Sequence, residues 1–192
     1  MSERKGAAAT PQTRLELTES VFFVGFMGAG KTSVSRKLAR TCGLAAVDMD
    51  TYIERDEGRT VSQIFAEDGE AGFRAIETRV LRRLSEGNPM LVGCGGGVVT
   101  TPENREILKE GGCVVFLRVT AREAKGRISD LSTRPLFNQL DDAERRNQER
   151  LPLYLEVADI EVDTAGKNVG AIAREVKREL RRRGVLREVP TQ

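Results

Sequence analysis

In the segment "GFMGAGKT", residues 25–32, four residues separate Gly25 from Gly30, which is followed directly by Lys31 and Thr32. Backbone N–H groups in such a loop can surround phosphate oxygens, and a following helix N-terminus adds partial positive charge. The Lys31 ammonium can reach the β- and γ-phosphates, and the Thr32 hydroxyl can bind Mg²⁺. This spacing predicts a nucleoside triphosphate site, which GTPase switches, ATPases and small-molecule kinases all share.

Two carboxylates follow the next apolar run, in the segment "VDMD". If residues 44–49 form a strand, Asp48 and Asp50 point to the same side of it. They would then lie at the carboxyl edge of a parallel sheet, where ligands bind, and a nearby Mg²⁺ would offset their repulsion. The alternative is a polar turn whose aspartate caps a helix beginning in "TYIERD". The motif alone leaves both interpretations open.

An arginine and a glutamate stand three residues apart in the amphipathic segment "DGEAGFRAIETRVLRRL". Arg74 and Glu77 share a helix face at this spacing. Taken alone, the pair is best interpreted as a weak surface ion pair. The functional alternative is that Glu77 fixes the Arg74 guanidinium so that its N–H groups can bind a ligand carboxylate.

A glycine triplet, Gly95 to Gly97, directly follows the apolar run "MLVGC". Consecutive glycines lose much backbone entropy on folding, so the triplet is either a surface loop or a place where something approaches the backbone. No run of four apolar residues ends here in an aspartate, which argues against an ordinary motor ATPase. The chain also contains no histidine, so catalysis must use carboxylates, lysine, arginine or a bound ion.

The elements that must position these residues alternate along the chain, as in βαβ units around a parallel sheet. The apolar runs predict strands at 21–26, 44–49, 90–94, 113–119 and 158–163. Helical patterns predict helices at 31–41, 60–68, 72–85, 141–156 and 168–183, and another that begins at Pro102 with Thr101 as its cap. Residues 51–86 and 129–142 interrupt the alternation and are typical of substrate-binding insertions or lids.

The composition is that of a soluble globular protein, with 192 residues, a net charge of +2, and 39% hydrophobic and 31% charged residues. This charge gives no reason to expect nucleic acid or membranes as partners, and no apolar run could span a bilayer. Three cysteines without tight pairing fit a reducing cytoplasm. The basic segment 174–187 is interpreted as a solvated helix face rather than a nucleic-acid or membrane patch.

The motifs "GFMGAGKT", "VDMD", "GEAGFRAIE" and "GCGGG" stand in this order and are followed by "TRPLF" and "RLPLY". The combination resembles shikimate kinases, small members of the nucleoside-monophosphate-kinase group of phosphate-loop proteins. The resemblance covers about residues 21–165. It implies a three-layer α/β/α sandwich with a central five-stranded parallel sheet, a helical substrate-binding region at about 51–86 and a lid at about 129–140. We expect one kinase domain at 21–185 between a disordered tail, 1–20, and a C-terminal tail, 186–192.

The resemblance also implies functions for individual residues. The ATP contacts would be Gly28, Ala29, Gly30, Lys31, Thr32, Ser33, Arg127, Arg134 and Lys167. The shikimate contacts would be Asp50, Arg74, Glu77, Gly95, Gly96, Gly97 and Arg150. One Mg²⁺ would be bound by Thr32 and, through water, by Asp48. The catalytic residues would be Lys31, Asp50 and the lid residue Arg134.

The implied reaction transfers the γ-phosphoryl group of ATP to the 3-hydroxyl of shikimate, a step in aromatic amino-acid biosynthesis. The expected enzyme is a cytoplasmic monomer that uses ATP and shikimate. One alternative is another small-metabolite kinase of the same fold, such as a gluconate kinase, which shares the phosphate loop. The other is a regulatory nucleotide-binding module that has lost catalysis, although none of the expected catalytic residues is missing.

Overall fold

The computed structural model describes residues 13–127 and 140–190. Its strands are β1 (Thr13–Leu17), β2 (Ser20–Val24), β3 (Ala46–Asp48), β4 (Leu91–Gly93), β5 (Gly112–Arg118), β6 (Ile160–Asp163) and β7 (Leu186–Pro190). Its α-helices are α1 (Lys31–Cys42), α2 (Met49–Glu57), α3 (Val61–Ser85), α4 (Pro102–Gly111), α5 (Ala121–Arg127), α6 (Leu140–Val157) and α7 (Val169–Arg182). A short 3₁₀ turn, η1 (Val98–Thr100), follows β4.

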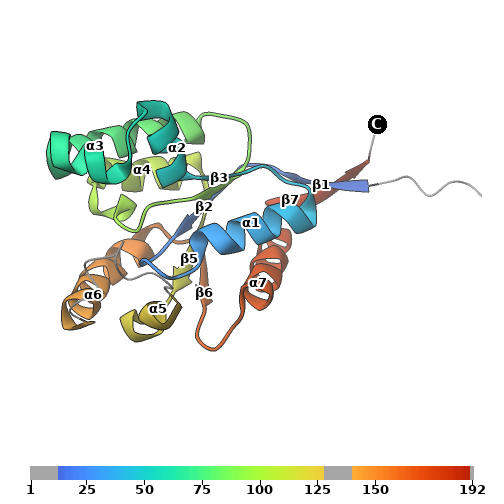
Figure 1. The fold of residues 1–192 in the computed structure, drawn as a ribbon. Helices are drawn as coiled ribbons and strands as arrows, with labels where there is room; N and C mark the ends of the chain where they lie inside the picture. Colours follow the sequence, from blue (N-terminus) through green and yellow to red (C-terminus); the bar gives the residue numbers. More distant parts are fainter. Residues whose placement is uncertain (1–12, 128–139, 191–192) are drawn as a thin grey trace, which may run out of the picture.

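The five predicted strands form one parallel sheet in the order β3-β4-β2-β5-β6 (Figure 1). Successive residues of β2 point to opposite faces, and all five of its residues are buried. Val21 and Phe23 belong to a core with α1 and α7, whereas Phe22 and Val24 belong to a core with α2, α3, α4 and α6. The three-layer α/β/α arrangement with five parallel strands is therefore confirmed.

The predicted helices are also present, with one difference of detail. The predicted break between 60–68 and 72–85 is confirmed, because Gly69, with φ 70° and ψ −176°, divides α3 into two helical parts. Thr101 occupies the position before α4, and Pro102 opens the helix, but the Thr101 side chain makes no capping hydrogen bond.

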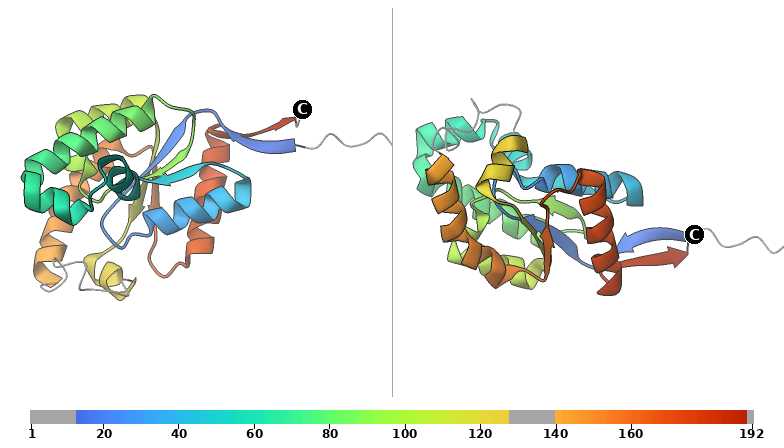
Figure 2. Two further views of the ribbon diagram at one scale, coloured as in Figure 1. Left: turned by 45° about the horizontal axis from the view of Figure 1, so that its top comes forward. Right: turned by 90° about the horizontal axis from the view of Figure 1, so that it is seen from below.

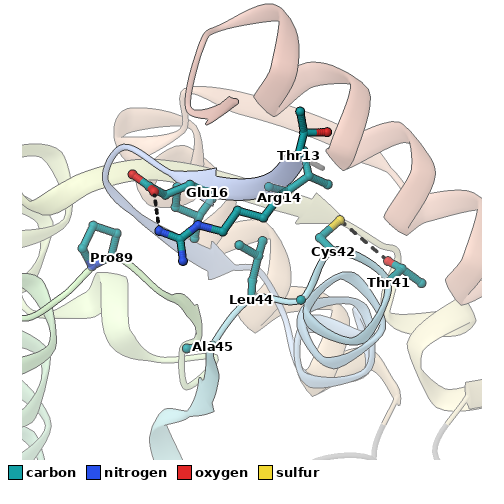
Figure 3. Close-up of a pocket in the computed structure, with 11 residues that line it drawn as sticks. Thr13, Arg14, Glu16, Thr41, Cys42, Leu44, Ala45 and Pro89 are labelled. Carbon is teal, nitrogen blue, oxygen red and sulfur yellow. Dashed lines mark hydrogen bonds and ion pairs between the residues drawn. The ribbon is translucent and has the colours of Figure 1, made fainter. Parts of the chain in front are cut away.

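The predicted terminal tails, 1–20 and 186–192, are wrong for the residues that the structure describes there. β1 pairs with β7 in an antiparallel ribbon that extends from the sheet (Figures 1 and 2). Leu17 and Leu186 are register partners and are 4% and 2% exposed. Because β1 and β7 lie at opposite ends of the chain, each is stabilised by a partner that no local pattern indicates. The ribbon and the end of α1 are shown in Figure 3.

Candidate functional site

The phosphate loop joins β2 to α1 and packs against the start of α5. Gly28 has φ 77°, and a Cβ there would lie 2.9 Å from Ala124 Cβ, so this turn accepts glycine and little else. The Lys31 Nζ donates to the carbonyls of Gly25 (2.8 Å) and Phe26 (3.1 Å), which folds the side chain back over the loop. α1 has no side-chain cap at its N-terminus, so its first N–H groups can serve an anionic ligand.

Thr32 and Asp48 meet where α1 begins and β3 ends. The Thr32 hydroxyl donates to Asp48 Oδ2 at 2.5 Å. The other Asp48 oxygen, Oδ1, accepts from the Thr51 N–H at 3.1 Å and so caps α2. The interpretation of Asp48 as a helix cap is therefore confirmed, and the same carboxylate also contacts Thr32 at the phosphate loop. Its binding of Mg²⁺ stays a prediction.

Asp48 and Asp50 do not share a strand face, because β3 ends at Asp48 and Asp50 lies in the first turn of α2. That expectation was wrong in its geometry, although both residues do lie at the carboxyl edge of the sheet. A Cβ on Gly95 would lie 3.2 Å from Asp50 Oδ1 and 3.0 Å from Glu77 Oε1. The helix start thus brings Asp50 to the glycine triplet and to the buried carboxylate of α3.

Arg74 and Glu77 form a partly buried ion pair. Arg74 Nη1 lies 2.6 Å from Glu77 Oε2, and the Glu77 side chain is only 1% exposed. The interpretation as a surface pair is therefore wrong. Burial raises the pKa of Glu77, and the Arg74 charge and hydrogen bond partly offset that rise. A second carboxylate, Glu70, contacts Arg74 Nη2 at 3.3 Å from the exposed side.

Two glycines of the triplet are needed because the chain's own groups occupy the space where side chains would be. A Cβ on Gly97 would meet Arg74 Nη2 at 2.5 Å, and one on Gly95 would meet Glu77 Oε1 at 3.0 Å. A Cβ on Gly96 would make only an ordinary contact, at 3.4 Å from Met27 N of the phosphate loop. None of the three glycines has a positive φ, so the requirement here is for space rather than for an unusual backbone conformation. Glu77, Arg74 and the phosphate loop therefore all pack against the short segment Gly95 to Gly97.

Hydrogen bonds hold the carbonyl groups of this segment on every side. Gly95 O accepts from Val98 N (3.2 Å), and Gly97 O accepts from the Thr100 hydroxyl (2.7 Å). The carbonyls of Val98 and Val99 accept from Asn104 Nδ2 (3.0 Å) and Arg105 Nη1 (2.9 Å). Among the described residues, the N–H groups of the three glycines donate to no acceptor.

Arg150 reaches the triplet from α6, because its Nη1 donates to Gly96 O at 3.2 Å. Tyr154, one helical turn further along, donates to the same oxygen at 2.5 Å. Tyr154 is the last residue of the segment "RLPLY" but is not among the predicted site residues. The i,i+4 spacing from Arg150 was the signal that could have identified it, since such residues share a helix face.

Three predicted ATP contacts are not tested by the described geometry. Arg134 and the expected lid lie outside the described residues, apart from residue 140 at the start of α6, and for Arg127 only the backbone at the end of α5 is described. Lys167 lies between β6 and α7, and its Nζ forms an ion pair with Glu175 at 2.7 Å. Its predicted contact with adenine stays a prediction.

A cavity of about 530 Å³ lies at the other end of α1, between β1 and the α1–β3 connection (Figure 3). Its lining includes Arg14, Glu16, Cys42, Leu44 and Pro89. No predicted site residue contributes to it, so it does not belong to the site at the phosphate loop. No helix of the described segments is long and apolar enough to cross a membrane.

A family model described as "Shikimate kinase" matches residues 27–181. A shikimate kinase of Halorhodospira halophila is 44% identical over 160 residues, which cover 81% of this chain and 90% of that protein. One from Dehalococcoides mccartyi is 36% identical over 170 residues, which cover 88% of this chain and 97% of the relative.

The solved structure of a shikimate kinase from Acinetobacter baumannii in complex with shikimate has a similar fold. It superposes with a TM-score of 0.78 at 36% identity, covering 86% of this chain and 94% of that one.

Proposed function

The chain belongs to the shikimate kinase family, and from this premise we propose that it transfers the γ-phosphoryl group of ATP to the 3-hydroxyl of shikimate. The observation that carries the proposal is the contact between two sites. The glycine triplet touches the phosphate loop on one side, and it touches Arg74, Glu77 and Arg150 on the other. A phosphoryl donor and a small anionic acceptor bound there would be neighbours.

The nucleotide half of the proposal rests on the phosphate loop. Gly28, Ala29 and Gly30, with the first turn of α1 from Lys31 to Ser33, would surround the phosphates. Mg²⁺ fits the pair formed by the Thr32 hydroxyl and the Asp48 carboxylate, since this ion prefers oxygen donors and is commonly held by few protein groups together with phosphates and water. When bound, Mg²⁺ would neutralise charge on the phosphate oxygens.

The acceptor half rests on the charges around the triplet. Arg74, held by Glu77, and Arg150, held at Gly96 O, would bind the shikimate carboxylate with their remaining N–H groups. The N–H groups of Gly95, Gly96 and Gly97 would donate to oxygens of the ring. This arrangement requires an acceptor that is small, oxygen-rich and anionic.

The reaction would be promoted mainly by positioning and charge stabilisation. The 3-hydroxyl oxygen forms a bond to the γ-phosphorus while the bond to the β,γ-bridging oxygen breaks, and ADP leaves. Asp50 would orient the hydroxyl and accept its proton. Lys31 would stabilise charge on the transferred group, and we extend this function to Arg134 from the family resemblance, with Arg127 as a further ATP contact.

We further propose a monomer that acts in the cytoplasm, with one kinase domain in which the α2–α3 segment is the substrate-binding region. The support for that segment is that it carries Asp50, Arg74 and Glu77. Size-exclusion chromatography with light scattering tests the monomer.

The test of function is ADP formation by the purified protein with ATP and Mg²⁺, in the presence of shikimate, of gluconate, or of neither. We expect only shikimate to stimulate turnover and phosphorus NMR to show shikimate 3-phosphate. Equal stimulation by gluconate, or none by shikimate, would overturn the substrate assignment. Loss of ATP binding in Lys31→Ala would separately test the phosphate loop.

A further inference from the structure

We propose that Tyr154 is a positioning residue of the acceptor-substrate site, whose hydroxyl holds the Gly96 peptide and the Arg150 guanidinium in one arrangement. The inference rests on the proposed function, because it assigns Tyr154 to the site that would bind shikimate. It adds a residue that does not itself touch the substrate and acts through two groups that would.

The Tyr154 side chain cannot move freely. It is 0% exposed, and its ring stacks on that of Phe116 with centroids 5.1 Å apart and an interplanar angle of 17°. The hydroxyl at the end of this clamped ring donates to Gly96 O at 2.5 Å, while Arg150 Nη1 donates to the same oxygen at 3.2 Å. One carbonyl therefore joins Tyr154 to Arg150.

The hydrogen bond from Tyr154 to Gly96 O orients the whole peptide group between Gly96 and Gly97. In a trans peptide the N–H points opposite to the carbonyl, so holding Gly96 O also fixes the direction of the Gly97 N–H. On its α-carbon side Gly96 faces the phosphate loop, where a Cβ would lie 3.4 Å from Met27 N and 3.6 Å from Gly25 O. Tyr154 therefore braces a peptide between the proposed acceptor site and the nucleotide loop.

A phenylalanine would fill the same core position without the cost of burying a hydroxyl. The hydroxyl therefore calls for an explanation other than packing. Burial also raises the pKa of Tyr154 to about 12, so the phenol keeps its proton and remains a donor at neutral and moderately alkaline pH.

The test is Tyr154→Phe, which removes the donor and keeps the ring. We expect the KM for shikimate to rise about tenfold, while kcat and the KM for ATP stay within about twofold of the parent. Without the phenol, Gly96 O depends on Arg150 alone, and the peptide and guanidinium no longer have one fixed arrangement. Calorimetric titration of shikimate into the protein should show the same loss of affinity without ATP.

The matched control is Thr41→Val, which removes a hydroxyl in the last turn of α1, at the end of the helix away from the phosphate loop. The Thr41 hydroxyl donates to Leu38 O at 3.1 Å, and Thr41 is not a predicted site residue. We expect its shikimate KM to equal that of the parent. If Tyr154→Phe lowers the melting temperature but leaves the shikimate KM and affinity unchanged, Tyr154 is only a core residue and the proposal fails.

A double variant tests the link to Arg150. Arg150→Lys keeps the charge but loses the planar set of donors. If Tyr154 acts through Arg150, the two changes together should raise the shikimate KM by less than the product of the single effects. Fully multiplicative effects would contradict the shared arrangement. A parent protein that forms no ADP with shikimate would instead contradict the proposed function itself.

Discussion

The Arg74 guanidinium lies directly against the α-carbon of Gly97, where a Cβ would come within 2.5 Å of Nη2 and 2.8 Å of Nη1. From the other direction Glu77 holds Nη1 at 2.6 Å. The guanidinium is therefore held between a buried carboxylate and a stretch of bare backbone, 23 residues away in the chain. The orientation of the Arg74 guanidinium therefore depends on residue 97 having no Cβ.

Gly97→Ala should displace Arg74 while leaving the fold nearly intact, because the clashing atoms are the end of a flexible side chain and Gly97 has an ordinary φ of −100°. We expect the shikimate KM to rise at least about tenfold, with a small change in melting temperature. Gly87→Ala is the control, since its Cβ would have no contact closer than 3.5 Å. Wild-type kinetics in Gly97→Ala would mean that Arg74 does not bind the substrate.

Two substitutions at Asp48 should separate its two contacts. Asp48→Asn keeps an oxygen that can cap α2 at Thr51 but loses the charge that faces Thr32. We expect a higher Mg²⁺ concentration for half-maximal activity and little loss of stability. Asp48→Ala loses the cap as well and should be less stable by a further ~1 kcal/mol. Chemical denaturation and Mg²⁺ titration measure the two effects, and an unchanged Mg²⁺ requirement in both variants would exclude Asp48 from metal binding.

The raised pKa of Glu77 should appear in the pH dependence of shikimate binding. Glu77 must be ionised to attract Arg74, so the shikimate KM should rise as the pH falls through the native pKa, which lies above the ordinary value of 4.5. Glu77→Gln removes this titration and should have a high KM at every pH. Parent and variant KM values that change in parallel with pH would assign the effect to another group.

Glu77 should also affect the free energy of unfolding, but with the opposite pH dependence, favouring the folded state at low pH. Because the native pKa is raised, the contribution of Glu77 is fully present below pH 4.5 and is lost as the pH rises through the native pKa. The difference in unfolding free energy between parent and Glu77→Gln should therefore fall over that interval and stay constant above it. Denaturant titrations at several pH values measure this difference.

The three cysteines should react slowly in the folded protein. All are buried, and burial raises the pKa of Cys113 to about 12 and that of Cys94 further, so little thiolate forms. Cys42 is the most exposed, at 8%, and lines the cavity beside β1, so it should react first with a thiol reagent such as DTNB (Figure 3). Full release of three equivalents should need denaturant. Rapid reaction of Cys94 would contradict the packing behind the glycine triplet.

Much of the fold could be predicted because its signals are local. A strand such as β5 is an uninterrupted apolar run, and α4 begins at a proline, so both are evident in a short window of sequence. β1 and β7 could not be predicted in this way. The segment 13–17 is partly polar, and it forms a strand because Leu17 meets Leu186 from the far end of the chain.

In the candidate site, too, some features could be predicted from local sequence and others depend on contacts between distant segments. The phosphate loop and the proximity of Arg74 to Glu77 follow from residue type and spacing, but the burial of that pair does not. The reason for the glycines does not follow either, because the atoms that leave no room for side chains at Gly95 and Gly97 come from α2 and α3. Tyr154 was missed because an aromatic residue on an apolar helix face usually indicates core, and only its contact with Gly96 O distinguishes it.

The ribbon of β1 and β7 has a practical consequence for rearranging the chain. Thr13 and Pro190 are opposite one another in its register, at the end of the molecule away from the phosphate loop (Figure 1). A short turn could therefore join residue 190 to residue 13, and new ends could be opened at the exposed Gly87 between α3 and β4. Such a circular permutant would keep the order of strands in the sheet while changing which segment is synthesised first.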